Sequence, residues 1–167
     1  MPPRSRQIVY VDTNVVIEAT RTGCWKALLQ TFDIRTVQKV SDEAEKEPMD
    51  KDGYVPVDMD LFKSKVTVEA VKEEDVLIAA STAPSIVNLD AGEKYLLARV
   101  AALNPDALLL TTGDKAAVKS ACQLQLGNRL ISLQELAERC GQKPKLREWF
   151  KKRWLEQVKT EFLLDSL

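Results

Sequence analysis

Histidine is absent from this chain of 167 residues, and cysteine is scarce. Without histidine, the chain has no imidazole general base, no histidine-containing catalytic triad and no histidine ligand for zinc. The three cysteines, Cys24, Cys122 and Cys140, form no C-x-x-C pair, so we expect neither a cysteine-rich zinc site nor a disulfide framework. Hydrolytic chemistry would therefore depend on carboxylates, hydroxyls, lysines or a hard metal ion with oxygen ligands.

Long apolar runs and a strong imbalance of charge are also missing. No stretch is long enough to cross a bilayer, and residues 1–7 contain no signal-peptide core, so we expect a cytoplasmic protein that does not enter membranes. The formal net charge of −1 gives no general attraction to nucleic acid, so a polyanionic partner would need a local basic surface or metal ions. The composition, 45% hydrophobic and 29% charged, predicts one globular domain.

Segments typical of strands and helices alternate along the chain. Stretches rich in apolar or β-branched residues predict strands at 8–11, 33–37, 65–71 and 107–112, and residues 127–132 are predicted to form a turn and a short strand. Helical periodicity predicts helices at 14–32 (broken near Gly23), 38–47, 72–81, 90–103, 113–126 and 133–141, with a loop over 49–60. Alternation of this kind predicts a three-layer α/β/α fold with a largely parallel sheet.

Acidic residues come after the predicted strands. Asp12 follows the first strand, Glu43 lies in the helix after the second, Glu93 opens a later helix, and Asp114 follows the strand at 107–112. Because parallel strands end at a common crevice, these carboxylates are expected to lie close together. Crowded carboxylates raise one another's pKa values and destabilise the fold unless a cation neutralises them. The pattern therefore predicts a site for Mg²⁺ or Mn²⁺, which prefer oxygen ligands.

Several stretches together resemble a PIN domain: VYVDTNVVIEA, an acidic residue after the second strand, LDAGEKYLLARVAAL and LLLTTGDKAAVKSA. The resemblance covers about residues 8–137, in the order and approximate spacing of the family. It implies that four carboxylates hold Mg²⁺ or Mn²⁺ and carry out catalysis: Asp12, Glu43, Glu93 and Asp114. It also implies that three neighbours orient the carboxylates or a bound water: Thr13, Asn14 and Thr112.

The same resemblance implies a metal-dependent endoribonuclease that hydrolyses RNA phosphodiester bonds. Bacterial members of the family are often the toxins of toxin–antitoxin pairs, in which a small antitoxin covers the acidic groove, and other members process RNA. RNA is therefore the expected substrate, and an antitoxin is a candidate partner. Two rival functions are a PIN-like module that binds RNA or regulates without turnover, and a flavodoxin-like ligand binder. The second rival is disfavoured because no Gly-rich phosphate loop follows the first strand.

Two of the acidic positions have alternatives. Glu47 lies one turn beyond Glu43 on the same helix face, but we prefer Glu43 because Val40 gives its turn an inward face and Glu47 lies at the helix end. Asp90 lies three residues before Glu93, which is the spacing of a helix N-cap, so Glu93 has the alternative of belonging to the cap. Taken singly, each acid has the simpler explanation of a helix cap or a solvated surface residue.

The remaining polar and aromatic residues are assigned to structure. Glu18 and Asp33 match no expected site position and are predicted to lie on the surface. The tryptophans Trp25, Trp149 and Trp154 are predicted to pack in the protein rather than to stack on bases. Cys122 and Cys140 are predicted to fill helix faces.

The predicted nuclease domain covers residues 1–142, and residues 143–167 are predicted to extend it with an amphipathic helix over 145–167. Apolar and basic residues alternate in this helix, so it is either a basic arm for RNA or a helix that packs on its own domain or on a second copy in a homodimer. Its aromatic content favours packing.

Overall fold

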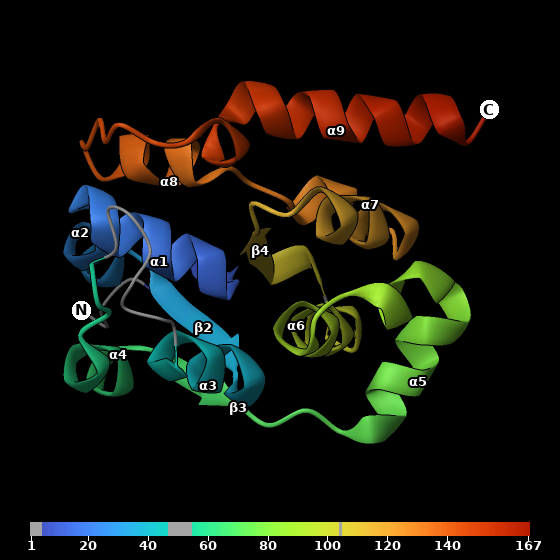
Figure 1. The fold of residues 1–167 in the computed structure, drawn as a ribbon, viewed down its shortest axis with the longest axis horizontal. Helices are drawn as coiled ribbons and strands as arrows, with labels where there is room; N and C mark the ends of the chain where they lie inside the picture. Colours follow the sequence, from blue (N-terminus) through green and yellow to red (C-terminus); the bar gives the residue numbers. More distant parts are fainter. Residues whose placement is uncertain (1–4, 47–54, 104) are drawn as a thin grey trace.

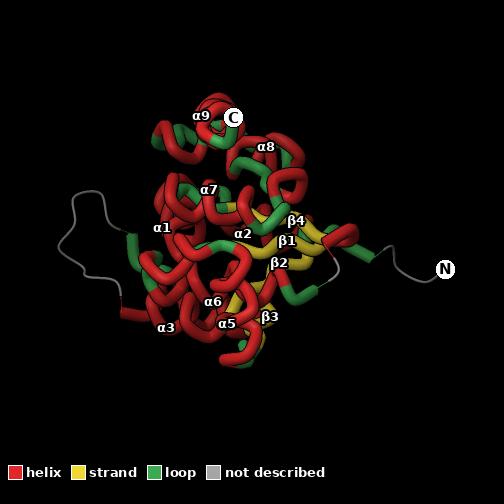
Figure 2. The backbone as a smooth tube through the Cα atoms, turned by 90° about the vertical axis from the view of Figure 1, so that its right-hand side faces the viewer, coloured by secondary structure: helices red, strands yellow, loops and turns green. Residues whose placement is uncertain are grey.

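The computed structural model describes residues 5–46, 55–103 and 105–167. Within these ranges, four parallel strands form one sheet in the order β3-β2-β1-β4. The strands are β1 (Ile8–Val11), β2 (Asp33–Val37), β3 (Thr67–Glu69) and β4 (Leu108–Thr111). Figure 2 shows them side by side in this order at the centre of the molecule. The predicted α/β class with a parallel sheet is confirmed. The short strand predicted within residues 127–132 is wrong: the 3₁₀ turn η3 (Gly127–Arg129) is followed only by a single bridge between Leu130 and Leu110.

Nine α-helices within the described residues surround the sheet, and Figure 1 shows how they are arranged. Their bounds are α1 (Thr13–Thr22), α2 (Trp25–Thr31), α3 (Gln38–Lys46), α4 (Met59–Lys65), α5 (Glu73–Thr82), α6 (Ala91–Ala101), α7 (Lys115–Gln123), α8 (Leu133–Arg139) and α9 (Lys152–Asp165). Across the described ranges, none of these helices combines the length and the apolar character that a membrane span requires.

Two apolar cores lie on opposite faces of the sheet, because successive residues of a strand point to opposite sides. Val9 and Val11 of β1 point into a core shared with α1, α2, α4 and α8. Tyr10 points into the other core, which is shared with α3, α5, α6, α7 and α9. This gives three layers, helices, sheet and helices. A sheet buried on both faces explains why its strands have nearly continuous apolar sequences.

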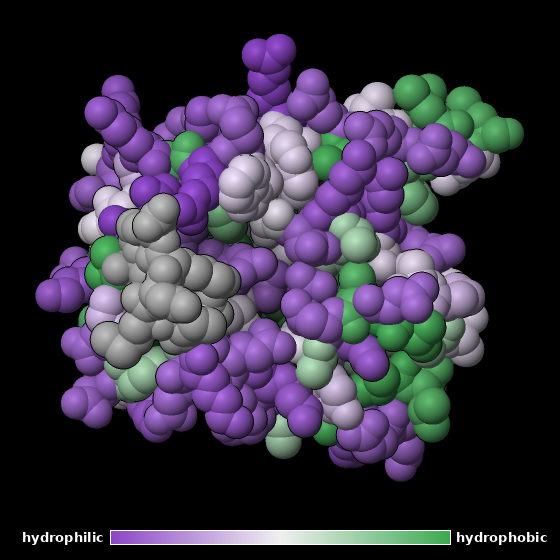
Figure 3. All heavy atoms as spheres, in the orientation of Figure 1, coloured by the Kyte–Doolittle hydropathy of each residue, from purple (hydrophilic) through white to green (hydrophobic). Residues whose placement is uncertain are grey.

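The carboxyl ends of the strands position the candidate site. All four strands are parallel, so β1, β2 and β4 end at the same edge of the sheet. α1 begins at Thr13 directly after β1, α3 begins at Gln38 directly after β2, and α7 follows the turn 112–114 after β4. The start of α6 joins this edge through contacts of α6 with α3 and α7. In Figures 1 and 3 this edge of the sheet faces the viewer.

The segment around α4 differs from the prediction. The sequence predicts a loop over 49–60 and a strand over 65–71, but α4 occupies Met59–Lys65 and the strand is only Thr67–Glu69. Residues 49–54 of the predicted loop lie outside the described residues. Phe62 is fully buried, and its ring centre lies 6.3 Å from that of Trp25. Packing between these two rings stabilises a short helix that local periodicity does not indicate.

The C-terminal segment also differs from the prediction of one helix over 145–167. Its first part forms the 3₁₀ turn η4 (Glu148–Phe150), and the α-helix α9 follows. α9 packs against α7: Leu155 and Val158 are buried, and Glu161 forms an ion pair of 2.8 Å with Lys115. The segment therefore packs on its own domain, which was one of the predicted arrangements.

Candidate active site

Asp12 lies at the junction of β1 and α1, and only 2% of its surface is exposed. Its Oδ1 atom accepts a hydrogen bond of 2.6 Å from the Thr13 N–H, so Asp12 caps α1. Its Oδ2 atom accepts a hydrogen bond of 2.8 Å from the Thr112 hydroxyl. Burial, with the negative charges of Asp90 and Glu43, raises the pKa of Asp12 to about 7, although both hydrogen bonds oppose this change. Capping alone does not explain why a carboxyl is buried among other acids.

Glu43 of α3 is held against the start of α6. Its Oε1 atom accepts a hydrogen bond of 2.9 Å from the Gly92 N–H, and its Oε2 atom accepts one of 2.8 Å from the Thr13 hydroxyl. Val40 is fully buried, which confirms the inward face predicted for this turn of α3. Gly92 leaves room for the carboxylate, since a Cβ there would lie 2.8 Å from the Glu43 Cδ atom. The sequence alone does not reveal this role of Gly92, because its partner is 49 residues away.

Glu93, in the first turn of α6, is also buried, with 5% of its surface exposed. Within the described part of the chain, its carboxyl forms no hydrogen bond or ion pair. Its N–H donates a hydrogen bond of 2.9 Å to Asp90, which caps α6 as predicted. Burial and the negative charges of Asp12, Asp114 and Asp90 raise the pKa of Glu93 to about 8. Glu93 is thus a buried acid surrounded by acids.

The turn after β4 carries Thr112, Gly113 and Asp114. The Thr112 hydroxyl, which donates to Asp12, also accepts a hydrogen bond of 3.3 Å from the Asp114 N–H. Asp114 Oδ1 accepts a hydrogen bond of 2.8 Å from the Ala117 N–H and caps α7. Thr112 therefore connects this turn to the end of β1 and fixes the orientation of the Asp12 carboxyl.

Hydrogen bonds and mutual charge effects connect four predicted site residues at the carboxyl edge of the sheet, and this place is called the acidic crevice from here on: Asp12, Glu43, Glu93 and Asp114. Asp12 and Glu43 line the pocket described below, whereas Glu93 and Asp114 lie behind its wall. Thr13 forms hydrogen bonds with Asp12 and Glu43, and Thr112 forms hydrogen bonds with Asp12 and Asp114. The charges of the neighbouring acids raise the pKa of Glu93. Among the described residues, however, no three acidic or cysteine side chains already enclose a position for a metal ion. Three of the carboxylates accept hydrogen bonds from backbone N–H groups instead: Asp12, Glu43 and Asp114.

A pocket of about 490 Å³ opens beside Asp12 and Glu43. Lys39 and Lys46 of α3 line it as well, and within the described residues neither ammonium forms an ion pair. Asn14 is exposed in the same pocket and makes no hydrogen bond through its side chain to any described residue. Figure 3 shows that hydrophilic side chains predominate around the hollow in the middle of this face. The Lys39 ammonium lies over the Tyr95 ring, 5.4 Å from its centre. The pocket thus combines two lysines with four carboxylates, those of Asp12, Asp42, Glu43 and Asp90.

Some assignments outside the crevice change. The prediction that Glu18 lies on the surface is wrong, because only 1% of its surface is exposed. Asp33 is half-buried and pairs with Arg35 at 2.8 Å. Trp25 is buried as predicted, whereas Trp149 is 44% exposed, contrary to the packing role predicted for it. Glu47, the alternative to Glu43, lies outside the described residues.

Comparison with protein-family models and with curated protein sequences finds no match to this chain. Any function therefore has to be inferred from the acidic crevice itself. Its useful properties are its place at the carboxyl edge of a parallel sheet, its buried acids with raised pKa values, and the lysines on its wall.

Proposed function

We propose that this chain is a metal-dependent endoribonuclease of the PIN-domain type, in which the acidic crevice is the active site. The observation that carries the proposal is the buried pair Asp12 and Glu93, whose pKa values are raised to about 7 and about 8. Within the described residues, neither has a lysine or arginine in ion-pair contact. Burying uncompensated carboxylates costs stability, and such arrangements are concentrated at functional sites.

The donor set fits Mg²⁺ or Mn²⁺, because it offers only carboxylate and hydroxyl oxygens. Asp12, Glu43, Glu93 and Asp114 would hold the ion. When bound, the ion would polarise the scissile phosphate, help to ionise a water and stabilise the leaving oxygen. The residues of the chain orient the carboxyls that would hold the ion. Thr112 fixes the Asp12 carboxyl, and Gly92 with Thr13 fixes that of Glu43.

Binding of a polyanion is supported by the wall of the pocket. The net charge of −1 gives no overall attraction, so the ammonium groups of Lys39 and Lys46, which form no ion pair within the described residues, have to supply it locally. The choice of RNA rather than another phosphodiester follows from the PIN resemblance. The same resemblance makes a small antitoxin and a second copy of the chain the protein partners to test. The rival proposal is a PIN-like module that binds RNA without cleaving it.

Cleavage of a panel of labelled RNAs with Mn²⁺, and with EDTA as the blank, tests the proposal. The wild type should cleave only with metal, and Asp12→Asn and Asp114→Asn should each reduce the rate about 100-fold or more, because ion-mediated stabilisation of the transition state is lost. Asp33→Asn is the matched control, since Asp33 begins β2 at the opposite edge of the sheet and should not affect the rate. Absence of cleavage by the wild type would favour the binding module, and full activity of Asp12→Asn would exclude this active site.

The second acid is tested separately. Glu43→Gln should abolish most cleavage, whereas Glu47→Gln should retain it, and the reverse result would move the second acid one turn along the chain. Mn²⁺ should also raise the melting temperature of the wild type, because a ligand that binds only the folded state stabilises it. An unchanged melting temperature at millimolar Mn²⁺ would contradict a metal site in the acidic crevice.

A further inference from the structure

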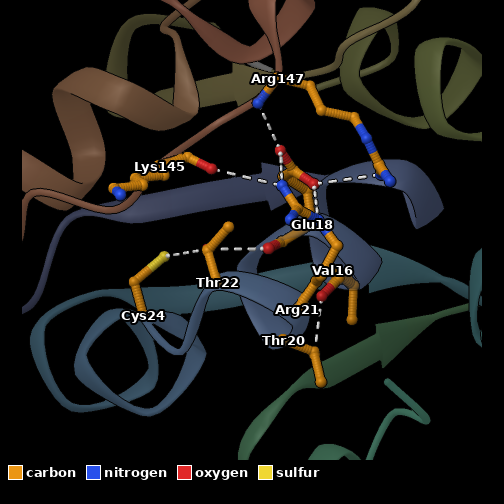
Figure 4. A network of polar contacts seen from close by, with 8 residues as sticks. All are labelled: Val16, Glu18, Thr20, Arg21, Thr22, Cys24, Lys145 and Arg147. Atoms are coloured by element: carbon orange, nitrogen blue, oxygen red, sulfur yellow. Dashed lines mark hydrogen bonds and ion pairs between the residues drawn. The ribbon is translucent and has the colours of Figure 1, made fainter. Parts of the chain in front are cut away.

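The chain between α8 and α9 is held in place by a buried carboxylate on α1. Glu18 Oε2 accepts a hydrogen bond of 2.7 Å from the Arg147 N–H, and Arg21 donates to both carboxylate oxygens at 2.7 and 2.9 Å. Arg21 also donates to the Lys145 carbonyl at 3.3 Å. Figure 4 shows these groups converging on Glu18. Although burial opposes it, these hydrogen bonds hold the pKa of Glu18 below its usual value, so the contact is a charged one.

This anchored segment reaches the acidic crevice through Phe150. The Phe150 ring lies over Gly113, the residue between Thr112 and Asp114, so closely that a Cβ on Gly113 would be 2.6 Å from Cε1 of the ring. Phe150 itself is buried in the core shared with α1 and α8. The turn η4 is therefore packed against the turn that carries one of the four acids.

The neighbouring aromatic residue of η4 packs only in part. Trp149 is 44% exposed, and its ring is tilted by 47° to that of Phe150 with the centres 6.1 Å apart. A large aromatic side chain gains much by burial, yet this one is left in solvent on a backbone that the Glu18 contacts and Phe150 hold rigidly. A partly exposed indole, next in the chain to the Phe150 ring that covers Gly113, has the character of a ligand contact.

The sequence on both sides of this indole is basic. Residues 143–153 contain six basic residues and one acidic residue, Glu148, a local excess that the net charge of −1 of the whole chain conceals. Lys151 pairs with Glu148 and Lys152 with Glu135. Lys145 and Arg153 form no ion pair within the described residues, and Figure 4 shows the Lys145 ammonium pointing away from the Glu18 contacts. Phosphate groups would therefore meet available cations on either side of η4 along the chain.

We propose that Trp149 is a stacking platform for a base of single-stranded RNA, with the basic residues of 143–153 binding the adjoining phosphates and the strand continuing into the acidic crevice. This rests on the proposed ribonuclease function and adds a binding role for Trp149 and the basic segment around it. Stacking on an indole requires a base that is free of its neighbours, which a duplex does not offer, and it tolerates any of the four bases.

Affinity for a labelled single-stranded RNA, measured by fluorescence anisotropy in EDTA, tests this platform without any cleavage. Trp149→Ala should weaken binding about 5- to 100-fold, the range that loss of one base–aromatic stack produces. Trp149→Phe should retain most of the affinity because it keeps an aromatic face. Leu163→Ala is the control for loss of an exposed apolar side chain, since Leu163 is 65% exposed in α9, and it should bind as the wild type does. A duplex of the same sequence should bind more weakly than the single strand.

Equal affinity of Trp149→Ala and wild type, equal losses in Trp149→Ala and Trp149→Phe, or no binding by the wild type would each overturn the platform. If instead Trp149→Ala loses only the binding of a protein partner, the indole belongs to a protein interface and the RNA proposal is wrong. Failure of the ribonuclease proposal gives a different pattern: single-stranded RNA still binds through Trp149 in EDTA, but the wild type does not cleave it with Mn²⁺.

Discussion

The metal-free protein should lose stability as the pH rises, and Asp12→Asn should remove a large part of this loss. Burial, with the charges of Asp90 and Glu43, raises the pKa of Asp12 from 3.8 to about 7. Between these two values the folded state keeps a proton that the unfolded state has released, so the free energy of unfolding falls with increasing pH. A pKa difference of this size corresponds to about 4 kcal/mol, of which about 3 kcal/mol falls between pH 5 and pH 8.

Asparagine in place of Asp12 has no charge to desolvate. Its carbonyl can still accept from the Thr13 N–H, but the Thr112 hydroxyl loses its acceptor, which costs about 1 kcal/mol at every pH. The stability of Asp12→Asn relative to wild type should therefore rise by about 3 kcal/mol from pH 5 to pH 8. Glu93 adds to this trend, because the charge of Asp12 contributes to its raised pKa and disappears in the variant.

Urea unfolding in EDTA, followed by tryptophan fluorescence at pH 5, 6, 7 and 8, measures this difference. Asp33→Asn is the control, because Asp33 is half-buried and paired with Arg35, away from the acidic crevice. Its stability relative to wild type should not show this rise. Mn²⁺ at pH 8 should stabilise the wild type more than Asp12→Asn. A stability difference between Asp12→Asn and wild type that stays the same from pH 5 to pH 8 would refute the account of Asp12 as a buried, uncompensated acid.

Two further variants test contacts around the crevice. Gly92→Ala should lower RNA cleavage at least about tenfold, because the new Cβ would displace the Glu43 carboxylate. The far-ultraviolet circular dichroism of this variant should stay unchanged. Wild-type activity in Gly92→Ala would show that this placement of Glu43 is not needed. Glu18→Gln should lower the free energy of unfolding by about 3 kcal/mol, equally with and without Mn²⁺, because the cations of Arg21 and Arg147 lose a buried partner. The surface variant Glu161→Gln should cost less than about 1 kcal/mol, and an equal loss in both variants would contradict the special role of Glu18.

The features that the sequence predicted correctly depend on local pattern and on sheet topology. β2 is found at Asp33–Val37 as predicted, because Ile34, Thr36 and Val37 are β-branched residues, which favour a strand. Asp12 and Asp114 could be placed near each other because both follow strands, and parallel neighbouring strands end at one edge. The N-cap role of Asp90 also follows from spacing alone.

The features that were missed depend on partners distant in sequence. Glu18 looks like a solvated helix residue until Arg147, 129 residues later, is brought to it. Phe62 makes a helix out of an apparent loop by packing on Trp25. Trp149 is a large aromatic residue of the kind that is usually buried, but Phe150 occupies the buried position beside Gly113, and Trp149 remains partly exposed. Single-residue hydrophobicity cannot decide which of two adjacent aromatic residues is buried.

The contact between Glu18 and Arg147 has a consequence for the order of events during synthesis of the chain. Glu18 leaves the ribosome 129 residues before Arg147, which at about 5–20 residues per second is a delay of roughly 6–26 s. Over that interval the Glu18 carboxylate has its contacts with Arg21 but lacks those with Arg147, and Gly113, once made, still lacks the covering ring of Phe150. The nascent chain therefore cannot complete the core that α1 shares with α8 until η4 has been made, and its apolar surfaces stay available to chaperones until then.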